Sequence, residues 1–272
     1  MQGEPWSPPA IDPTVPSVAR MYDYYLGGTN NYQADRDACA ALLEQVPSTK
    51  ELALNNRQFL RRVVRYLAEQ QGITQFIDHG SGLPTRDNVH QVAQRVHHEA
   101  RIVYVDNDPI VLAHGRALLD ENPYTTVIQA DMRDTTRIFD HPDTRRIIDF
   151  SKPVAALFVS VLHCIPDDDP AQLIRNVVRR LVPGSFLVIC QLVSADPKVR
   201  TFVTDFMDEA TDHHWGRVRE EHEVAAYFEH EDLALLDPPG LVEVSAWMPD
   251  NDLARPQRSW EWKEWGGVAQ VR

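Results

Sequence analysis

The stretch QFIDHGSGLPT, residues 75–85, places an aspartate just before a glycine-rich turn. Its first half is apolar enough for a short buried strand, and the glycines at 80–82 allow the backbone to approach a ligand closely. In dinucleotide-binding proteins a pyrophosphate lies on such a turn, and the acidic residue follows about twenty residues later. Asp78 would repel that pyrophosphate, and Pro84 interrupts the helix expected after the turn. The stretch therefore favours a ligand that is cationic at this point.

The chain around this stretch alternates between two hydrophobic periods. Short apolar runs predict five buried strands, at residues 74–78, 101–106, 125–131, 154–161 and 185–192. Helical patterns lie between several of them, at residues 88–96, 108–119 and 169–181. Asp108 and Asp169 each precede a proline, which marks the start of a helix. Strands that alternate with helices predict an α/β fold with a parallel, doubly wound sheet.

The flanking segments differ in composition and predict three parts of the chain. Residues 1–16 hold five prolines and suggest a flexible arm. Residues 17–72 are expected to form an N-terminal helical cap, whose long helix starts at Ser48 or Thr49 and stops at Gly72. Residues 73–272 would be the ligand-binding domain, and we expect a C-terminal antiparallel hairpin built from 241–247 and 266–272.

The overall composition excludes several classes of function. The chain has 272 residues and a net charge of −13, which disfavours a nucleic-acid partner. Basic clusters at 57–65 and 175–180 have helical spacing, so we interpret them as solvated helix faces. The N-terminus lacks the features of a signal peptide, and no apolar run is long enough to span a membrane, so we expect a cytoplasmic protein. The three cysteines are far apart in the sequence, and the histidines lack the spacing of metal ligands, so we expect no metal site.

Acidic residues also end the next two predicted strands. In open parallel sheets, ligands bind outside the carboxyl ends of the strands. Asp106 is placed to accept hydrogen bonds from two ribose hydroxyls, and Asp131 is placed to accept one from an adenine amino group. An adenosine ligand with a cationic amino-acid end and no phosphate suits these residues and Asp78. S-adenosylmethionine (SAM) has this chemistry, so we expect SAM as the cofactor.

Several motifs carry a resemblance to a known family: YDYYLGGTNNY, NNRQFLRR, QFIDHGSGLPT, NVHQVAQ, VYVDNDP, QADMRD, LVPGSFLV and GLVEVSAW. In these motifs, from about Asp12 to Arg272, the chain resembles the class I SAM-dependent methyltransferases. It is most similar to the actinobacterial S-adenosyl methyltransferase family, once catalogued as a domain of unknown function. The resemblance implies a Rossmann-like, seven-stranded, mostly parallel sheet that binds SAM through the strand-end acids. His79 departs from the pattern, because a branched apolar residue is expected there.

The candidate cofactor-binding residues combine the strand ends with the N-terminal segment: Asp78, Gly80, Ser81, Gly82, Asp106, Asn107, Asp131, Met132, Ser160, Tyr22 and Tyr25. The two tyrosines either close over the cofactor as a lid or seal the open end of the sheet. His163 follows the fourth strand, where class I methyltransferases place groups that contact the acceptor. It is the candidate general base, and a purely structural histidine is the alternative.

The sequence thus predicts an enzyme that transfers a methyl group from SAM to an unidentified acceptor, most simply a small molecule. One alternative is a SAM-binding module without transferase activity. The other is an NAD-dependent oxidoreductase, which Asp78, Pro84 and Thr85 disfavour. A second cavity reached from the loop at 160–164 would distinguish an enzyme from a silent module. Homodimer formation stays open at this stage.

Overall fold

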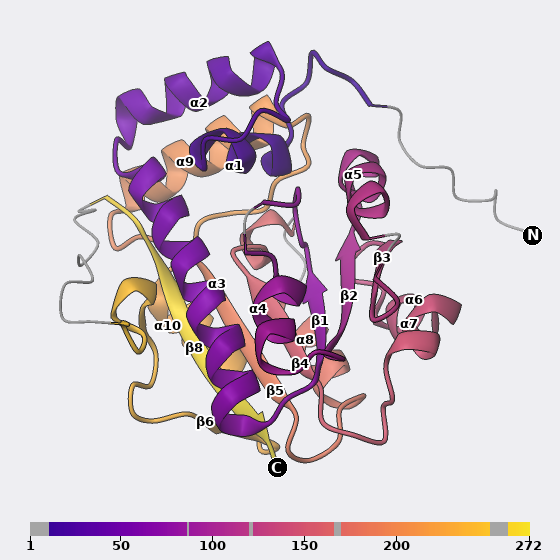
Figure 1. The fold of residues 1–272 in the computed structure, drawn as a ribbon. Helices are drawn as coiled ribbons and strands as arrows, with labels where there is room; N and C mark the ends of the chain where they lie inside the picture. Colours follow the sequence, from indigo (N-terminus) through magenta and orange to yellow (C-terminus); the bar gives the residue numbers. More distant parts are fainter. Residues whose placement is uncertain (1–10, 86, 120–121, 166–169, 251–260) are drawn as a thin grey trace, which may run out of the picture.

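The structure is a computed structural model that describes residues 11–85, 87–119, 122–165, 170–250 and 261–272. Within these ranges one mixed sheet runs through the centre of the molecule (Figure 1). Its strands are β1 (Gln75–His79), β2 (Arg101–Asp106), β3 (Thr125–Gln129), β4 (Ala155–Val159), β5 (Phe186–Val193), β6 (Leu233–Leu235), β7 (Val242–Glu243) and β8 (Lys263–Val271). The order β3-β2-β1-β4-β5-β8-β6 gives seven strands, and the two-residue β7 adds to β8 as an eighth.

Strands β1 to β5 are parallel, as their hydrophobic runs predict. Strand β1 lies between β2 and β4, so the chain reverses its direction of winding beside β1. Ligands bind at such a reversal in open α/β sheets, outside the carboxyl ends of the strands. All five residues of β1 are buried, because helices cover both of its faces.

The helices divide between the two faces of the sheet and its carboxyl end. One face packs on α3 (Thr49–Gln71) and α4 (Val89–Val96), with α5 (Pro109–Leu119) beside β3. The other face packs on α6 (Thr135–Asp140), α7 (Pro142–Ile147), α8 (Pro170–Val178), α10 (Glu221–Ala225) and the 3-10 turn η2 (Ala226–Phe228). The start and the end of α3 are confirmed, and Gly72 closes the helix in the left-handed conformation, at φ 67°.

Three further helices lie above the carboxyl ends of the strands (Figure 1). They are α1 (Val18–Tyr25), α2 (Gln33–Gln45), which the sequence analysis did not anticipate, and α9 (Pro197–Ala210). With the start of α3 they form a separate apolar cluster around Met21, Leu42 and Met207. A buried ion pair joins α1 to α2, because Arg20 Nε lies 2.9 Å from Asp35 Oδ2. Residues 1–10 of the expected flexible arm lie outside the described residues.

The antiparallel C-terminal strands are confirmed, but the strand expected over residues 241–247 is much shorter than predicted. The alternating residues 241–247 form only β7 and the 3-10 turn η3 (Val244–Ala246). The strand β6 instead lies on the outer edge of β8. Strand β8 starts at Lys263, three residues earlier than expected, and pairs with β5 over eight residues. The alternation of apolar and polar residues wrongly indicated a long strand here, because the same pattern fits a turn that packs one face on α3.

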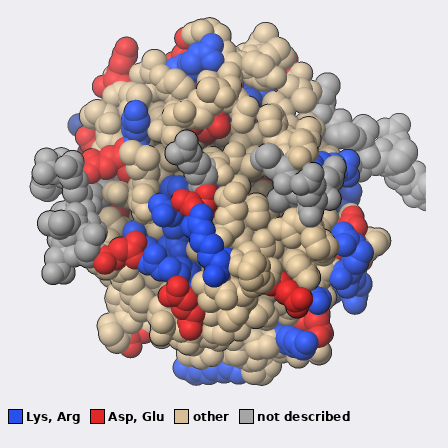
Figure 2. Space-filling view, viewed as in Figure 1, with Lys and Arg blue, Asp and Glu red and all other residues tan. Residues whose placement is uncertain are grey.

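Basic side chains of α3 have two different environments. Arg61 and Arg65 are partly exposed, and Arg61 and Arg95 both pair with Asp87. Figure 2 shows such Lys and Arg side chains interspersed with acidic ones on this face. Arg62 contradicts the expectation of a solvated face, because it is buried and donates to the carbonyl oxygens of Val244 and Trp247.

Candidate active site

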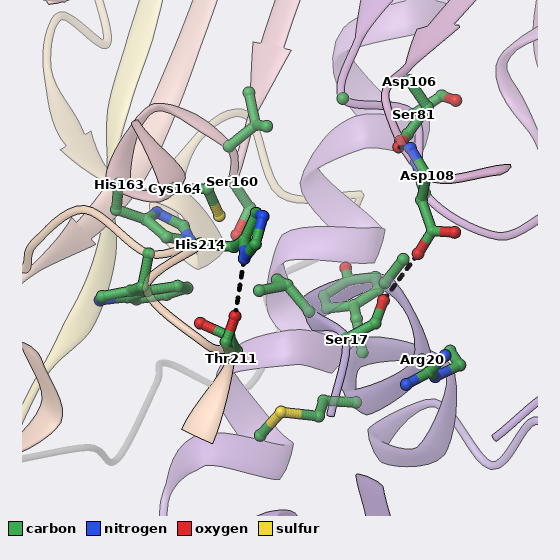
Figure 3. Close-up of a pocket in the computed structure, with 18 of the residues that line it drawn as sticks. Ser17, Arg20, Ser81, Asp106, Asp108, Ser160, His163, Cys164, Thr211 and His214 are labelled. Carbon is green, nitrogen blue, oxygen red and sulfur yellow. Dashed lines mark hydrogen bonds between the residues drawn. The ribbon is translucent and has the colours of Figure 1, made fainter. Parts of the chain in front are cut away.

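A cavity of about 530 Å³ opens between the carboxyl ends of β1, β2 and β4 and the helices above them. Its volume is in the usual range for a small-molecule site, about 300–1,000 Å³. In Figure 3, Ser81, Asp106 and Asp108 lie on one side of the cavity, and Ser160, His163, Cys164 and His214 lie on the other. The cavity thus has two walls, one made by the glycine turn and the ends of β1 and β2, and one made by the loop after β4.

The turn after β1 requires glycine at its first position. Gly80 has φ 68°, and a Cβ atom there would lie 2.1 Å from Val161 Cγ2. Gly82 also has a positive φ, 64°, but a Cβ atom at this position would meet no neighbouring atom within 4 Å. The backbone N–H groups of Gly80 and Ser81 both donate to Val105 O, which ties the turn to β2. The turn therefore lines the cavity with backbone, and Ser81 adds only a small side chain.

Asp106, at the end of β2, is held by the backbone around it. Its Oδ2 accepts from Gly82 N at 2.8 Å, and its Oδ1 accepts from Asp108 N at 2.9 Å. Each carboxylate oxygen can accept a second hydrogen bond, so the group can still bind a diol. Burial raises the pKa of Asp106 to about 6, although these backbone N–H groups favour the charged form. A ligand that donates hydrogen bonds would favour the charged form further.

Asp78 is the buried acid of the site, with 5% of its surface exposed. Burial raises its pKa to about 7; the Arg57 guanidinium acts in the opposite direction, and the Asp106 carboxylate adds to the rise. No hydrogen bond to the Asp78 carboxylate is found among the described residues. A buried carboxylate without a donor is suited to a cation, because a positive group would offset the cost of burying its charge. This matches the amino-acid end of SAM and disfavours a pyrophosphate.

The N-terminal segment contributes to the same cavity. Tyr22 and Tyr25 both line it, so the structure brings the two tyrosines to the strand-end acids. The Tyr22 hydroxyl donates to Ala53 O at 3.1 Å and accepts from Asn56 Nδ2 at 3.0 Å, which anchors the ring on α3. Burial raises the pKa of both tyrosines, so they stay neutral. The placement is compatible with either the lid or the seal.

Ser160 stands directly after β4 in a conformation that serine rarely adopts, at φ 59°. Its hydroxyl donates a short hydrogen bond to Glu264 Oε1, and both residues line the cavity. Glu264 belongs to β8, is fully buried, and was missed in the sequence analysis. Its signal was weak: one acid between two tryptophans, in a segment without a helical or glycine-rich motif.

His163 also lines the cavity, but its environment does not favour a base. Its Nδ1 accepts from Leu192 N at 3.4 Å, so this nitrogen carries no proton. Burial and the Arg219 charge lower the pKa of His163 to about 3. A group that resists protonation so strongly is a poor proton acceptor near neutral pH. The ring also lies 4.9 Å from that of Trp215, between their centroids, which suits a packing role.

The remaining candidates divide between the cavity and its surroundings. Asn107 and Met132 line the cavity. Asp131 is not among the residues that line it; its half-exposed carboxylate is bound by Arg133, with 2.6 Å between Oδ2 and Nη2. Strand β3 ends at Gln129, two residues before the predicted end, which leaves Asp131 in the following turn. The role proposed for Asp131 therefore stays a prediction.

His79, the departure from the family pattern, points into the core instead of the cavity. Its ring stacks on Phe158 at 4.2 Å between centroids, and its Nδ1 lies 3.2 Å from Leu157 O. Burial lowers its pKa to about 4, so the ring is neutral. A flat neutral ring replaces the branched apolar side chain here without disturbing the glycine turn.

The cavity continues under the helical cap into what we name the apolar chamber. It is lined by Met21, Tyr25, Leu42, Leu52, Leu192, Met207, Trp215 and Trp262, which all belong to one apolar cluster. The chamber is one part of the cavity that also holds the glycine turn and the loop at 160–164, so the expected second cavity stays a prediction. Among the described residues, no group of His, Cys, Asp or Glu side chains could hold a metal ion. Within the same part of the chain, none of the helices is long and apolar enough to cross a membrane.

Comparisons with known proteins agree with this geometry. The S-adenosyl methyltransferase family matches residues 4–272. A crystal structure of a protein from Thermobifida fusca, assigned as a methyltransferase, is 38% identical, covers 98% of this chain and 99% of its own, and has a TM-score of 0.85. A DUF574 family protein from Streptomyces avermitilis is 35% identical, with 97% and 100% covered and a TM-score of 0.86. A search of curated proteins found no match.

A more distant structure supports the fold alone. Geranyl diphosphate methyltransferase in complex with SAM is 11% identical, with 78% of this chain and 85% of that chain covered and a TM-score of 0.53. The family match spans nearly the whole chain, and the fold is the one that the sequence resemblance implies. The chain therefore belongs to the S-adenosyl methyltransferase family, and it is a SAM-dependent methyltransferase.

Proposed function

We propose that this methyltransferase acts on a small, largely apolar acceptor that binds in the apolar chamber. The observation that carries the proposal is the burial of the chamber walls: Met207, Trp215 and Trp262 are each no more than 4% exposed. Ligand pockets for small molecules are concave and mostly apolar, with a few placed polar groups. A protein side chain would have to reach this chamber past the cap helices, whereas a small molecule could be enclosed by them.

In this proposal the cofactor lies against the other wall of the cavity. Asp78 would face its cationic amino-acid end, and the Asp106 carboxylate would accept from its ribose hydroxyls. The backbone of the glycine turn and the side chains of Asn107 and Met132 would complete this wall. When bound, SAM supplies a methyl group on a positively charged sulfur. A nucleophile can attack the methyl carbon and displace the sulfur, so the carbon needs no further activation.

The residues of the chain then act mainly by alignment and exclusion of water. Well-oriented reactants can gain up to roughly 7–11 kcal/mol from proximity alone. The chamber residues would hold the acceptor at the end of β4, between the cofactor wall and the cap. Tyr22 and Tyr25 would cover both ligands, and the anchored Tyr22 hydroxyl would keep its ring in place.

A screen with two parts tests the proposal. Purified enzyme and tritiated SAM are incubated with a library of planar aromatic and terpenoid molecules that carry hydroxyl, thiol or amino groups, and in parallel with protein extract. We expect label in small-molecule fractions and none in protein. Exclusive labelling of protein would contradict the proposal. A matched variant, Leu42→Arg, places a charge in the chamber and should abolish transfer while calorimetry shows SAM binding retained.

The charges around the cavity narrow the class of acceptor. The net charge of −13 disfavours a nucleic acid as the acceptor. Among the described residues that line the cavity, the arginine and lysine side chains that could pair with phosphate are Arg20 and Arg57. Arg20 is bound by Asp35, and Arg57 donates to Asp87 O and Asn88 Oδ1. We therefore favour an acceptor without a phosphate group.

A further inference from the structure

The bond between Ser160 and Glu264 joins two segments 104 residues apart. Both residues line the cavity; Ser160 is partly exposed, whereas Glu264 has no exposed surface. Glu264 uses one oxygen to accept from Ser160; the other, Oε2, is buried without a hydrogen-bond partner in the described part of the chain. A buried carboxylate that is only half satisfied is costly to the fold, so its retention needs a reason.

The backbone at Ser160 adds a second observation. A serine at φ 59° costs about 1–3 kcal/mol, and such strain gathers at functional sites. The strained conformation follows β4 directly and is supported by the hydrogen bond from Ser160 N to Cys190 O, at 2.9 Å. It places the hydroxyl at the cavity wall and within hydrogen-bond distance of the carboxylate. Glycine would relieve the strain but would remove the hydroxyl, so the side chain itself is what the position requires.

The groups around Glu264 favour its neutral form. Burial raises the pKa of Glu264 to about 7; Ser160 and Cys190 oppose the rise, and the Glu243 charge adds to it. Tyr22 on α1 and Cys164 on η1 (Leu162–Cys164) also interact with its charge. These neighbours are acids, thiols or a phenol, and none is a cation. Glu264 can therefore exchange a proton near neutral pH, where general bases are most effective.

We propose that Ser160 and Glu264 form a proton relay that deprotonates a hydroxyl group of the acceptor, so that the enzyme is an O-methyltransferase. The inference rests on the proposed small-molecule acceptor. As the acceptor oxygen forms its bond to the methyl carbon, the sulfur–carbon bond breaks and its electron pair stays on sulfur. The acceptor proton passes to Ser160 Oγ, and the serine proton passes to Glu264. The products are the methyl ether, S-adenosylhomocysteine and a protonated Glu264.

The arrangement fits a hydroxyl better than an amine or a thiol. A serine hydroxyl both donates and accepts, so it can bond an acceptor hydroxyl and transmit its proton. A cationic amine would be recognised better by an exposed carboxylate, whereas Glu264 has no exposed surface and already accepts from Ser160. A thiol ionises readily near neutral pH and needs little help from a base. In this scheme Ser160 is the catalytic residue and Glu264 acts through it.

The first test uses no acceptor. Infrared difference spectra of the SAM complex, with Glu264→Gln as the reference, report the protonated carboxyl of Glu264 as a function of pH. We expect this band to disappear around pH 7, and at a higher pH in Ser160→Ala, because the serine hydrogen bond favours the charged form. A carboxyl that stays protonated throughout the range in which the protein is folded contradicts the relay.

Calorimetry on the same variants separates the acceptor side from the cofactor side. Ser160 was a candidate cofactor-binding residue in the sequence analysis, and the relay assigns it to the acceptor instead, so Ser160→Ala and Glu264→Gln should bind SAM about as tightly as the wild type. A loss of about tenfold or more, 1.4 kcal/mol, would instead assign the pair to the cofactor. Circular dichroism on each variant checks the fold, and Glu243→Gln is the matched control for removal of a nearby negative charge.

The second test compares two acceptors that differ in one atom, 2-naphthol and 2-naphthalenethiol, with tritiated SAM. Glu264→Gln should slow transfer to the naphthol by about 100-fold or more and leave transfer to the thiol nearly unchanged. The wild-type rate on the naphthol should rise through pH 7, and this rise should vanish in the variant. Equal losses on both acceptors indicate a merely structural pair and contradict the relay. If the wild-type enzyme methylates neither probe, the proposed acceptor class is contradicted. The infrared experiment needs no acceptor, so it tests the relay independently of that outcome.

Discussion

The Ser17 hydroxyl donates a 2.8 Å hydrogen bond to Asp108 Oδ2, across 91 residues of chain (Figure 3). Asp108 also begins α5, because its Oδ1 accepts from Ile110 N at 2.8 Å, and its own N–H donates to Asp106. Asp108 thus connects the start of the cap, through its side chain, to the acid expected to hold the ribose, through its backbone N–H. The position of the cap and the geometry of the candidate cofactor site are therefore physically linked.

This link predicts that Ser17→Ala weakens SAM binding without unfolding the protein. Loss of one hydrogen bond to a partly exposed carboxylate should cost about 1 kcal/mol, or roughly a fivefold loss of affinity. Calorimetry with SAM measures it. Thr14→Ala is the control, since the side-chain hydrogen bond of Thr14 in the described part of the chain goes to the exposed Asp12, and the affinity should stay unchanged.

The buried charge of Asp78 predicts a conflict between stability and binding. Burial raises the pKa of Asp78 to about 7 in the folded protein, above its value in the unfolded chain. Below about pH 4 the carboxyl is protonated in both states, so the stability linked to its protonation is fully present. This stability is lost as the pH rises through 7, because the folded protein must then bury a charged carboxylate. Asp78→Asn should therefore stabilise the SAM-free protein at pH 8, on the order of 2–4 kcal/mol. Urea unfolding at pH 4 and pH 8 checks this, and an equal effect of the substitution at both pH values would contradict it.

The same acid predicts how SAM affinity depends on pH. A cation is bound best by the ionised carboxylate, so affinity should rise between about pH 5 and 7, by at most tenfold per pH unit. Binding should release a proton, which calorimetry detects as heats that differ between buffers of different ionisation enthalpy. In Asp78→Asn both the pH dependence and most of the proton release should disappear.

Two of the predicted strand-end acids, Asp106 and Asp131, are expected to differ in their contribution to SAM binding. Asp106→Ala should cost about 2–3 kcal/mol of SAM binding, a roughly 30- to 150-fold loss, because two charge-assisted hydrogen bonds are removed. Asp131→Asn should cost about 1 kcal/mol or less, since its side chain pairs with Arg133 outside the cavity walls. Titration of both variants with SAM tests the ranking. If Asp131→Asn is the more damaging of the two, the adenine must lie over the turn after β3.

The glycine turn offers a matched pair of substitutions. Gly82→Ala meets only the cost of a left-handed backbone, about 1–2 kcal/mol of folding stability. Gly80→Ala meets the same cost and also a collision with Val161, which should add about 1–3 kcal/mol. Thermal unfolding compares the two variants. Equal destabilisation would show that Val161 can move aside.

Much of the fold could be predicted because its signals are local. The apolar stripe of α3 and the glycine after it set both ends of that helix, and buried apolar runs located the parallel strands. The short α6 and α7, six residues each, carry too few turns for periodicity to show. Residues 241–247 alternate like a strand, yet they turn after Glu243, because Arg62 of α3 holds the carbonyl oxygens of Val244 and Trp247.

By itself the sequence determined the fold class and the cofactor, and it placed Asp78 and Asp106 at one cavity, because both follow strands whose ends meet at one edge of a parallel sheet. Only the tertiary structure decided which side chains form the opposite wall of that cavity. Glu264 reaches Ser160 because β8 runs antiparallel beside β5, so that the start of β8 lies at the edge where β4 and β5 end. Asp131 was predicted to line the cavity but lies in the turn after β3, because β3 ends at Gln129 and the neighbouring Arg133 binds the Asp131 side chain. Such contacts depend on strand register and on partners distant in sequence, which no local pattern encodes.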